Sequence, residues 1–281
     1  MTSSGEHLPG VPHLGSGLGY RRELRDHILR AAGRIDVLEI VTEQFMDAEG
    51  ELEELADHFP VIPHGVGLSL GTVGPLDRDY LSRVKRVCDL IDAPYYSEHL
   101  AITRAPGIDI GHLSPVWFVE DQLRTVVDNI AAVQDFLGRP LVVENISYLL
   151  EIPYATMSQG EFFHRMVEAT GCGVLLDVAN VHINSCNHGF SAEAFLDSMP
   201  LHAVVQIHLA GGFLDGDVYI DGHCARVNEP TWKLLEVLAE RVPVRVSILE
   251  QDADFPDELT PMLDDVDRSR QIITAAGEGR R

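Results

Sequence analysis

The chain has 281 residues, of which 45% are hydrophobic, so it is long enough to bury one large core or two modest ones. Its 44 acidic residues outnumber 21 basic ones and give a formal net charge of -23, which argues against nucleic-acid binding because such a surface repels a phosphate backbone. No apolar run reaches the roughly 18 to 20 residues needed to cross a bilayer, and the first residues lack a secretory signal pattern. We therefore expect a cytoplasmic protein with no membrane partner.

Short apolar runs alternate with longer amphipathic segments along the chain, a rhythm typical of strand-helix units. The apolar runs predict eight strands, at residues 15–20, 36–41, 64–70, 94–100, 140–146, 173–179, 203–210 and 244–250. Apolar residues at three- and four-residue spacing predict helices over 77–90, 115–137 and 229–240. A capping box, "SQGE" (158–161), begins another helix, and "GCG" (171–173) ends it.

Eight strand-helix units in a chain of this length predict a single (β/α)8 barrel domain over residues 1–281. We expect about the first 12 and the last six residues to be flexible. The competing architecture is a doubly wound open sheet, which would need a glycine-rich phosphate loop after the first strand. "GSGLGYRRE" (15–23) does not fit that GxGxxG pattern in register.

Imidazole, carboxylate and amide groups stand at the ends of the predicted strands, where a (β/α)8 barrel builds its active site. They are His99, Glu144, Asp177, Asn180, His208, Glu250 and Asp252, joined by Asp221 and His223 in the loop after the seventh strand and by His64 near the start of the third. Charged groups are seldom buried unless they are paired or bound to metal. The cluster therefore predicts bound divalent or trivalent cations.

The type of ligand limits the metal. Imidazole with carboxylate, and no cysteine in the set, suits iron, zinc or manganese and argues against copper(I) or iron-sulfur clusters. Carboxylates such as Glu144, Asp177 and Glu250 can bridge two ions. The set is too large for one metal, so we expect two or three.

The ordered set resembles the trinuclear metal site of the endonuclease IV type of abasic-site repair enzyme, one of the xylose-isomerase-like barrels. One position departs from that pattern. The repair enzymes have histidine three residues after the strand-six aspartate, whereas this chain has Asn180, a weak and neutral ligand.

A closer resemblance covers nearly the whole chain. The multinuclear non-haem iron-dependent oxidative enzymes (MNIO family), which include the methanobactin-biosynthesis oxidase, are similar to this chain in several motifs that occur in order. These are "GSGLGYRRE", "HGVGLSLG" (64–71), "YSEHLAIT" (96–103), "LGRPLVVENISYLL" (137–150), "CGVLLDVANVHINSCNHGF" (172–190), "IHLAGG" (207–212) and "LEQD" (249–252). "DVAN" matches the Asp-x-x-Asn of that family, so Asn180 agrees with it.

The resemblance implies a xylose-isomerase-like barrel holding two or three iron ions (Fe2+/Fe3+), with zinc or manganese as alternatives. It would use O2 to modify residues, commonly cysteine, of a ribosomally synthesised precursor peptide that a separate partner protein presents. Carried over residue by residue, the metal ligands would be His64, His99, Glu144, Asp177, Asn180, His208, Asp221, His223 and Glu250. On the substrate side would lie Asn187, His188 and Asp252.

The alternative is a metal-dependent hydrolase or sugar isomerase on the same barrel. A hydrolase would use a metal-bound hydroxide with Glu250 or Asp252 as the base. Asn180 and the net charge argue against phosphoester hydrolysis, and no lysine follows a predicted strand, as an isomerase would need. A non-catalytic scaffold would be expected to lack a central ligand, and none is missing.

Overall fold

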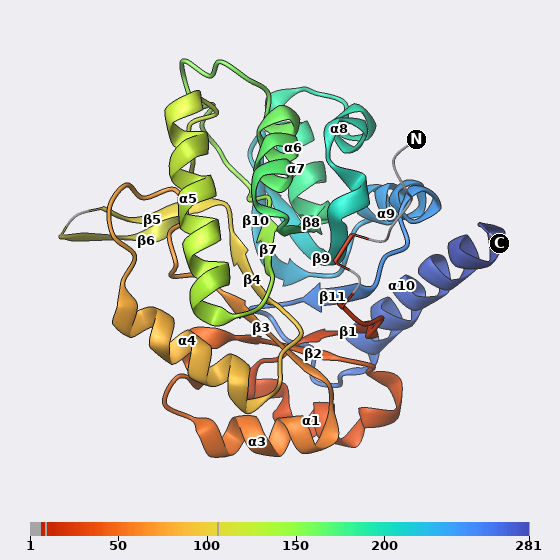
Figure 1. Cartoon of the computed structure of the whole chain (residues 1–281). Coiled ribbons are helices and arrows are strands. Elements are labelled where there is room, and N and C mark those ends of the chain that lie inside the picture. Colours follow the sequence, from red (N-terminus) through yellow and green to blue (C-terminus); the bar gives the residue numbers. More distant parts are fainter. Residues whose placement is uncertain (1–6, 9, 106, 281) are drawn as a thin grey trace.

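The computed structural model describes residues 7–8, 10–105 and 107–280, and its centre is a closed barrel of eight parallel strands (Figure 1). The barrel strands are β1 (Gly15–Gly19), β2 (Leu38–Val41), β3 (Val61–Gly65), β4 (Tyr96–His99), β7 (Leu141–Glu144), β8 (Gly173–Asp177), β9 (Val204–Asp215) and β11 (Val246–Glu250). Parallel pairing of β1 with β11 and of β8 with β9 closes the ring. The predicted (β/α)8 barrel is confirmed.

Helices surround the barrel (Figure 1). They are α1 (Arg25–Arg30), α2 (Thr42–Phe45), α3 (Glu49–His58), α4 (Arg78–Leu90), α5 (Glu120–Leu137), α6 (Gln159–Thr170), α7 (Val178–His188), α8 (Ala192–Ser198), α9 (Glu229–Arg241) and α10 (Thr260–Gly279), with 3-10 turns at Arg22–Leu24, Ala32–Arg34 and Leu201–Ala203. The Ser158 side chain caps α6 by accepting a hydrogen bond from the Glu161 amide, and left-handed Gly171 ends it, as predicted. Of the helices in the described ranges, none is both long and apolar enough to span a membrane.

Alternation along the strands divides the barrel interior into two levels. A buried cluster fills one level with apolar side chains, including Val37, Ile62, Val142, Leu175 and Ile248. Two residues further along each of these strands stands a buried polar side chain: Glu39, His64, Glu144, Asp177 and Glu250. Since side chains two residues apart in a strand point to the same face, the apolar level supports a polar level at the carboxyl ends.

The third strand differs from its predicted bounds. It covers Val61–Gly65 rather than 64–70, so His64 lies at the carboxyl end and not at the start. Leu68 and Leu70 are buried in the layer between barrel and helices, so their apolar character reflects the burial of a turn. This shift brings His64 to the same level as the other predicted ligands.

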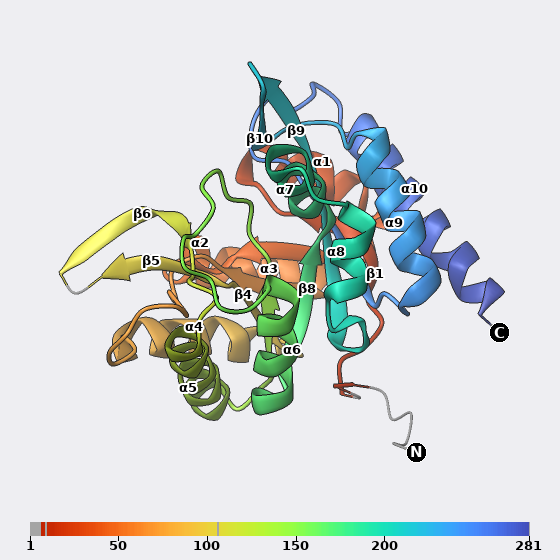
Figure 2. The ribbon, with the colours of Figure 1, turned by 90° about the horizontal axis from the view of Figure 1, so that it is seen from above.

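Two hairpins extend the barrel where the sequence suggested other structure. Strands β5 (Ala101–Ala105) and β6 (Ile108–Pro115) form an antiparallel hairpin that projects from the molecule (Figures 1 and 2), and the helix predicted from residue 115 begins at Glu120. The expected loop after the seventh strand is a second hairpin, in which β9 pairs with β10 (Val218–Ala225). Most of β6 is exposed, so it lacks the alternation that identifies a half-buried strand.

Two other segments are helical where the sequence suggested irregular structure. Residues 178–188, which were not among the predicted helices, form α7, and this helix begins directly after Asp177. Helix α10 continues to Gly279, within the end that we expected to be flexible. Residues 1–6, 9 and 281 of the expected flexible ends lie outside the described residues, so their flexibility stays a prediction.

Candidate metal centre

The predicted ligands converge at the carboxyl ends of the barrel strands around a cavity of about 320 Å³. Eight of the nine line it: His64, His99, Glu144, Asp177, Asn180, Asp221, His223 and Glu250. The ninth, His208, is fully buried and contacts the Glu144 and Glu250 carboxylates. Asp252 also lines the cavity.

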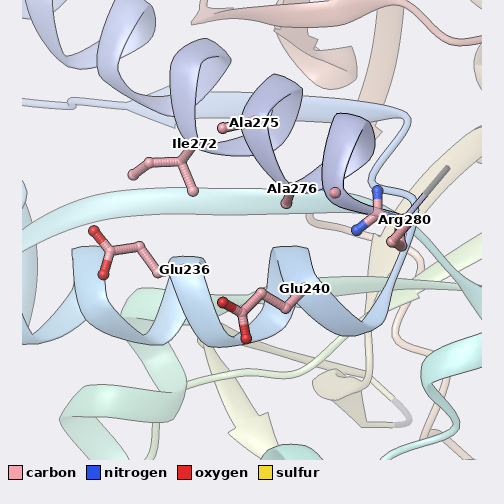
Figure 3. Close-up of a pocket in the computed structure, with 7 residues that line it drawn as sticks. Glu236, Glu240, Ile272, Ala275, Ala276 and Arg280 are labelled. Atoms are coloured by element: carbon pink, nitrogen blue, oxygen red, sulfur yellow. The ribbon is translucent and has the colours of Figure 1, made fainter.

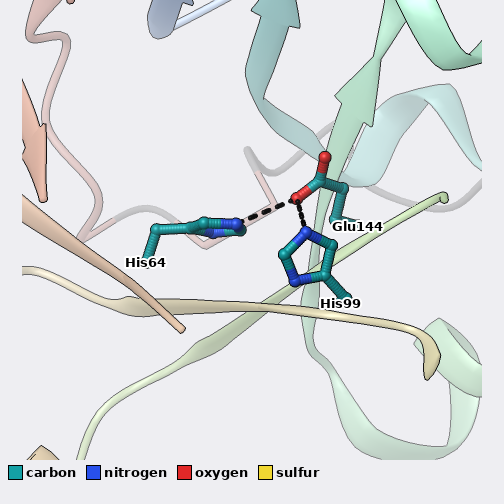
Figure 4. A group of neighbouring side chains, drawn as sticks. All are labelled: His64, His99 and Glu144. Atoms are coloured by element: carbon teal, nitrogen blue, oxygen red, sulfur yellow. Dashed lines mark ion pairs between the residues drawn. The ribbon is translucent and has the colours of Figure 1, made fainter. Parts of the chain in front are cut away.

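Glu144 stands between two histidines (Figure 4). Its Oε2 atom lies 3.3 Å from His64 Nε2 and 3.4 Å from His99 Nε2. The other ring nitrogens contact groups outside the cavity: His64 Nδ1 lies 3.0 Å from the Ser97 hydroxyl, and His99 Nδ1 lies 3.0 Å from the Gly65 carbonyl. Such contacts fix the rotation of an imidazole, so both Nε2 atoms are held toward the carboxylate.

His208 faces the opposite way, with Nδ1 toward the cavity. This atom lies 3.0 Å from Glu250 Oε2 and 3.3 Å from Glu144 Oε1. On the far side of the ring, Nε2 lies 2.8 Å from Glu39 Oε1, and the Gln206 amide donates to the same carboxylate. Glu39 was missed in the sequence, although a carboxylate inside the apolar run "VLEIV" was a signal.

Asp177 and Asn180 stand at the start of α7. Asp177 Oδ1 accepts a hydrogen bond of 2.8 Å from the backbone amide of Asn180, and this bond caps the helix. Asn145 binds the backbone of Asp177 through two hydrogen bonds of 3.0 and 3.1 Å, and its own carbonyl accepts from the Asn180 side chain. With these contacts made, Asp177 Oδ2 and Asn180 Oδ1 remain buried with no hydrogen-bond partner among the described residues.

The β9–β10 hairpin brings Asp221 and His223 over the cavity. His223 Nε2 lies 2.9 Å from Asp221 Oδ1, and the Ser147 hydroxyl donates to the other oxygen of Asp221 at 3.0 Å. His223 has a left-handed backbone (φ 45°) within an irregular part of the ladder. An irregularity of this kind redirects side chains, and here it accompanies two potential ligands, Asp221 and His223, that are separated by one residue.

The open side of the cavity carries an ion pair. Arg21, which follows β1, donates from Nε to Asp252 Oδ1 at 2.6 Å, and its Nη2 atom lies 3.8 Å from Glu250 Oε1. Asp252 Oδ2 in turn lies 3.2 Å from His223 Nδ1. Arg21 was not predicted; its position directly after a predicted strand was the available signal. His112 of β6 also lines the cavity, and because β6 was not identified, no signal marked it.

The electrostatics of the cluster show how tightly its groups depend on one another. Burial alone would lower the pKa of His99, but the charges of Glu144 and Glu98 outweigh burial and raise this pKa to about 9. Burial would raise the pKa of Glu144, and the neighbouring imidazoles, His99 first, lower it to about 2. Burial together with Glu144 and Asp221 raises the pKa of Asp177 well above its ordinary value. Protons on the imidazoles thus balance buried carboxylates, a role that metal cations also fill.

Several buried atoms of the predicted ligands form no hydrogen bond among the described residues, although most of them lie within ion-pair distance of another ligand: Glu144 Oε2, Asp177 Oδ2, Asn180 Oδ1, His208 Nδ1, Asp221 Oδ1 and both ring nitrogens of His223. Four sets of three residues have ligand atoms within 4.8 Å of one another: His64/His99/Glu144, Glu39/His208/Glu250, Glu144/Asp177/His208 and Asp177/His223/Glu250. Buried polar atoms without a hydrogen bond cost free energy unless something binds them. The residues therefore fit metal binding, and the sharing of Glu144 and Asp177 between sets fits more than one ion.

Asn187 and His188, expected on the substrate side, lie in the last turn of α7 and do not line this cavity. The Asn187 amide exchanges two hydrogen bonds, of 2.9 and 2.8 Å, with the backbone of Tyr219 in β10. His188 Nε2 lies 2.8 Å from the Tyr148 carbonyl, and the two rings stack. Both residues thus hold neighbouring segments against α7, and a substrate role for them stays a prediction.

A larger hollow, of about 630 Å³, lies between α9 and α10 and contains none of the predicted ligands. Figure 3 shows Glu236 and Glu240 on one helix facing Ile272, Ala276 and Arg280 on the other. Among its lining residues there is no histidine or cysteine, so this hollow lacks the imidazole groups that line the cavity at the barrel mouth.

Comparison with known proteins identifies a family and a fold for this chain. A family model described as "RiPP precursor modification enzyme MbnB/TglH/ChrH" matches residues 15–274. A UPF0276 protein of Rhizorhabdus wittichii is 36% identical over 92% of this chain and 95% of its own length, and one of Pseudomonas aeruginosa is 35% identical over 95% of each. Among solved structures, a xylose isomerase domain protein of Alicyclobacillus acidocaldarius has a TM-score of 0.59 at 15% identity, covering 92% of this chain and 96% of that one. The structural likeness establishes a xylose-isomerase-like barrel.

Proposed function

This chain belongs to the MbnB/TglH/ChrH family of RiPP precursor modification enzymes, and we propose that it is a multinuclear iron enzyme that uses O2. Its substrate would be a ribosomally synthesised precursor peptide, with cysteine as the residue modified. The observation that carries the proposal is the group of buried nitrogen and oxygen atoms without a hydrogen bond that the predicted ligands bring together around one cavity.

The ligand atoms favour iron, zinc or manganese over magnesium and calcium, and the resemblance to multinuclear iron enzymes motivates the choice of iron. A site of carboxylate and carbonyl oxygens alone would suit magnesium or calcium, whereas imidazoles select iron, zinc or manganese. His64, His99 and Glu144 would hold one ion; Asp177, His223 and Glu250 would hold another, with Asn180 and Asp221 beside them. Glu144 and His208 join the two sets and would complete a place for a third ion. Iron bound there would supply a redox-active centre able to react with O2 and to bind a thiolate.

The remaining residues of the mouth would prepare the cavity for a peptide side chain. Arg21 holds Asp252 at the rim and balances part of its charge. Leu113 and Ile146 form apolar walls beside the ligands, and these walls would limit the access of water to a bound side chain. A cavity of about 320 Å³ has room for one side chain and a small co-substrate. The family also motivates the proposal that a separate protein presents the peptide.

Metal analysis tests the proposal directly. Protein expressed in iron-supplemented medium should contain two or three irons per chain by elemental analysis, with Mössbauer spectra that indicate interacting ions. Glu144→Ala should lose more than one iron because Glu144 belongs to two of the ligand sets, and His99→Ala should lose at least the ion that it would hold with His64 and Glu144. His58→Ala, at an exposed histidine of α3, is the matched control and should keep the full iron content.

Oxygen uptake separates this proposal from the hydrolase or isomerase alternative. An iron-loaded chain should consume O2 when a thiol peptide and a reductant are supplied. Stoichiometric zinc with little iron, and no O2 uptake after reconstitution with iron, would contradict the oxidative function and favour a metal-bound hydroxide.

A further inference from the structure

A second hollow, of about 540 Å³, adjoins the metal cavity at the barrel mouth. The two hollows share four lining residues: His112, Leu113, Ser147 and Asp221. A peptide residue placed beside the predicted ligands would therefore have its neighbour at the entrance to the second hollow. We call this hollow the apolar groove and define it by Leu113, Tyr148, Leu149, Leu150, Ile183 and Ile220.

The apolar groove exposes side chains that are usually buried. Leu149 is 61% exposed and Leu150 is 77% exposed, and the two residues are adjacent in one loop. Single exposed apolar residues are common on protein surfaces, but exposed residues that line a hollow beside a polar site are typical of ligand binding. The groove is thus suited to accept apolar surface from a partner molecule.

Contacts from α7 fix two walls of the groove. Asn184 Oδ1 accepts from the Tyr148 amide at 3.0 Å, and the Asn184 amide donates to the Ile146 carbonyl, also at 3.0 Å. On the other wall, the side chain of Asn187 is paired with the backbone of Tyr219. A preformed groove loses little entropy when a ligand enters, so these contacts favour binding over collapse.

The charges around the groove restrict its occupant. Among its lining residues in the described ranges there is no lysine or arginine, and Asp221 stands where it meets the metal cavity. An acidic side chain would lose hydration in the groove and would find no lysine or arginine there to pair with. An apolar or aromatic side chain would lose no favourable charge interaction and would bury its surface.

We propose that the apolar groove binds an apolar or aromatic side chain of the precursor peptide, next to the residue that is modified at the metal cavity. The inference rests on the proposed function and adds a sequence preference to it. A volume of about 540 Å³ accommodates one aromatic side chain together with peptide backbone. The modified residue would thus be selected by its neighbour as well as by its own chemistry.

Three synthetic pentapeptides test the proposal: acetylated and amidated Gly-Phe-Cys-Phe-Gly, Gly-Ser-Cys-Ser-Gly and Gly-Asp-Cys-Asp-Gly. Their dissociation constants would be measured by calorimetry with the iron-loaded chain under anaerobic conditions. Burial of one phenylalanine side chain should make the first peptide bind about tenfold to 100-fold more tightly than the serine peptide. The aspartate peptide should bind more weakly than the serine peptide.

A double variant, Leu149→Asp with Leu150→Asp, should abolish the preference for phenylalanine. Both positions are exposed, so the variant should fold and keep its iron. Val73→Asp is the matched control, because Val73 is 72% exposed and does not line the groove. Equal affinity for the phenylalanine and serine peptides, no binding of the phenylalanine peptide, or a preference that the double variant retains would each overturn the proposal.

The same experiment separates this inference from the proposed function. If the chain holds iron and consumes O2 but shows no preference, the groove is not the subsite and the enzyme class stands. If the chain binds no iron, titrations of the metal-free protein still show whether phenylalanine is preferred, so the groove is judged independently of the metal.

Discussion

Glu39 illustrates how a residue outside the predicted set completes the candidate site. It lies 2.8 Å from the ring nitrogen of His208 that faces away from the cavity, and Gln206 donates to its other oxygen. Gln206 in turn accepts from the Tyr95 hydroxyl at 2.7 Å. A buried carboxylate behind a metal-binding imidazole makes the imidazole a stronger ligand and fixes its rotation.

We therefore predict that Glu39→Gln weakens iron binding by about 10-fold to 100-fold without unfolding the chain. Glutamine keeps the shape of the side chain but removes the charge that supports His208. Competition of the loaded protein with a chelator of known affinity measures the effect. Glu53→Gln, at an exposed position of α3, is the control and should change nothing. Unaltered iron affinity in Glu39→Gln would show that the carboxylate has only a packing role.

At the level of single residues, histidines and carboxylates that follow apolar strands were the most informative part of the sequence. This pattern identified His99, Glu144 and Asp177 because parallel strands bring their carboxyl ends to one mouth. It did not identify Glu39, which lies inside its strand, or Arg21, whose role depends on a contact with Asp252, 231 residues away in sequence. Contacts of that kind depend on the closure of the barrel, which no local pattern records.

Among the structural elements, α7 does the most to organise the mouth. Its first turn carries Asn180, and its last turn carries Asn187 and His188, which hold β10 and the Tyr148 loop. Strand β10 lies at the end of the sheet, and its edge would be unpaired at Tyr219 without the Asn187 amide. The Asn187 side chain thus satisfies the backbone groups of Tyr219 that a neighbouring strand would otherwise bind.

Asn187→Ala should consequently loosen β10 while leaving iron binding intact. Loss of the two hydrogen bonds should raise the amide hydrogen-exchange rate of Tyr219 by about tenfold, since each bond contributes on the order of 1 kcal/mol. Ser158→Ala, which removes the cap of α6, is a control for general destabilisation and should leave the Tyr219 rate nearly unchanged. Loss of iron in Asn187→Ala with normal exchange at Tyr219 would contradict this structural role.

Which elements could be predicted follows from burial. The barrel strands are buried on both faces and read as apolar runs, so all eight were found, although β3 was placed several residues late. The β5–β6 hairpin was not found because β6 is mostly exposed, and α7 was not predicted because polar residues that face neighbouring loops and strands interrupt its apolar spacing. Hydrophobic periodicity identifies a helix or strand by the apolar residues that face the core. Elements that surround a polar site carry fewer such residues and are therefore the hardest to predict.

For the whole molecule, the four cysteines divide into two classes by burial. Cys88 and Cys172 are buried, and burial raises the pKa of the first thiol to about 12 and of the second to about 11. Cys186 is exposed and Cys224 is partly exposed. The thiolate is the reactive form, so reactivity should follow this division.

We expect two thiols to react quickly with a disulfide reagent at pH 8 and two to react only after unfolding. Variants Cys186→Ser and Cys224→Ser should each remove one fast thiol. In the unfolded chain a thiol has a pKa of about 8.5. Because the pKa values of Cys88 and Cys172 are higher in the folded chain, their protonated thiols favour the fold below pH 8.5. This contribution to stability is lost as the pH rises toward 11 to 12. The melting temperature should therefore fall above about pH 9, and four fast thiols in the native chain would contradict the burial of this pair.

Metal removal tests how the whole barrel depends on its mouth. Bound ions would be contacted by residues from β3, β4, β7, β8, β9, β10 and β11, so they would link strands that are far apart in sequence. A ligand that binds only the folded state stabilises it by mass action, about 4 kcal/mol when its concentration is 1,000 times the dissociation constant. Extraction with a chelator should lower the melting temperature, and added ferrous iron should restore it. The apolar level of the barrel contains no predicted ligand, so the metal-free chain should still unfold cooperatively. Identical melting of loaded and extracted protein would mean that metal does not bind at the strand ends.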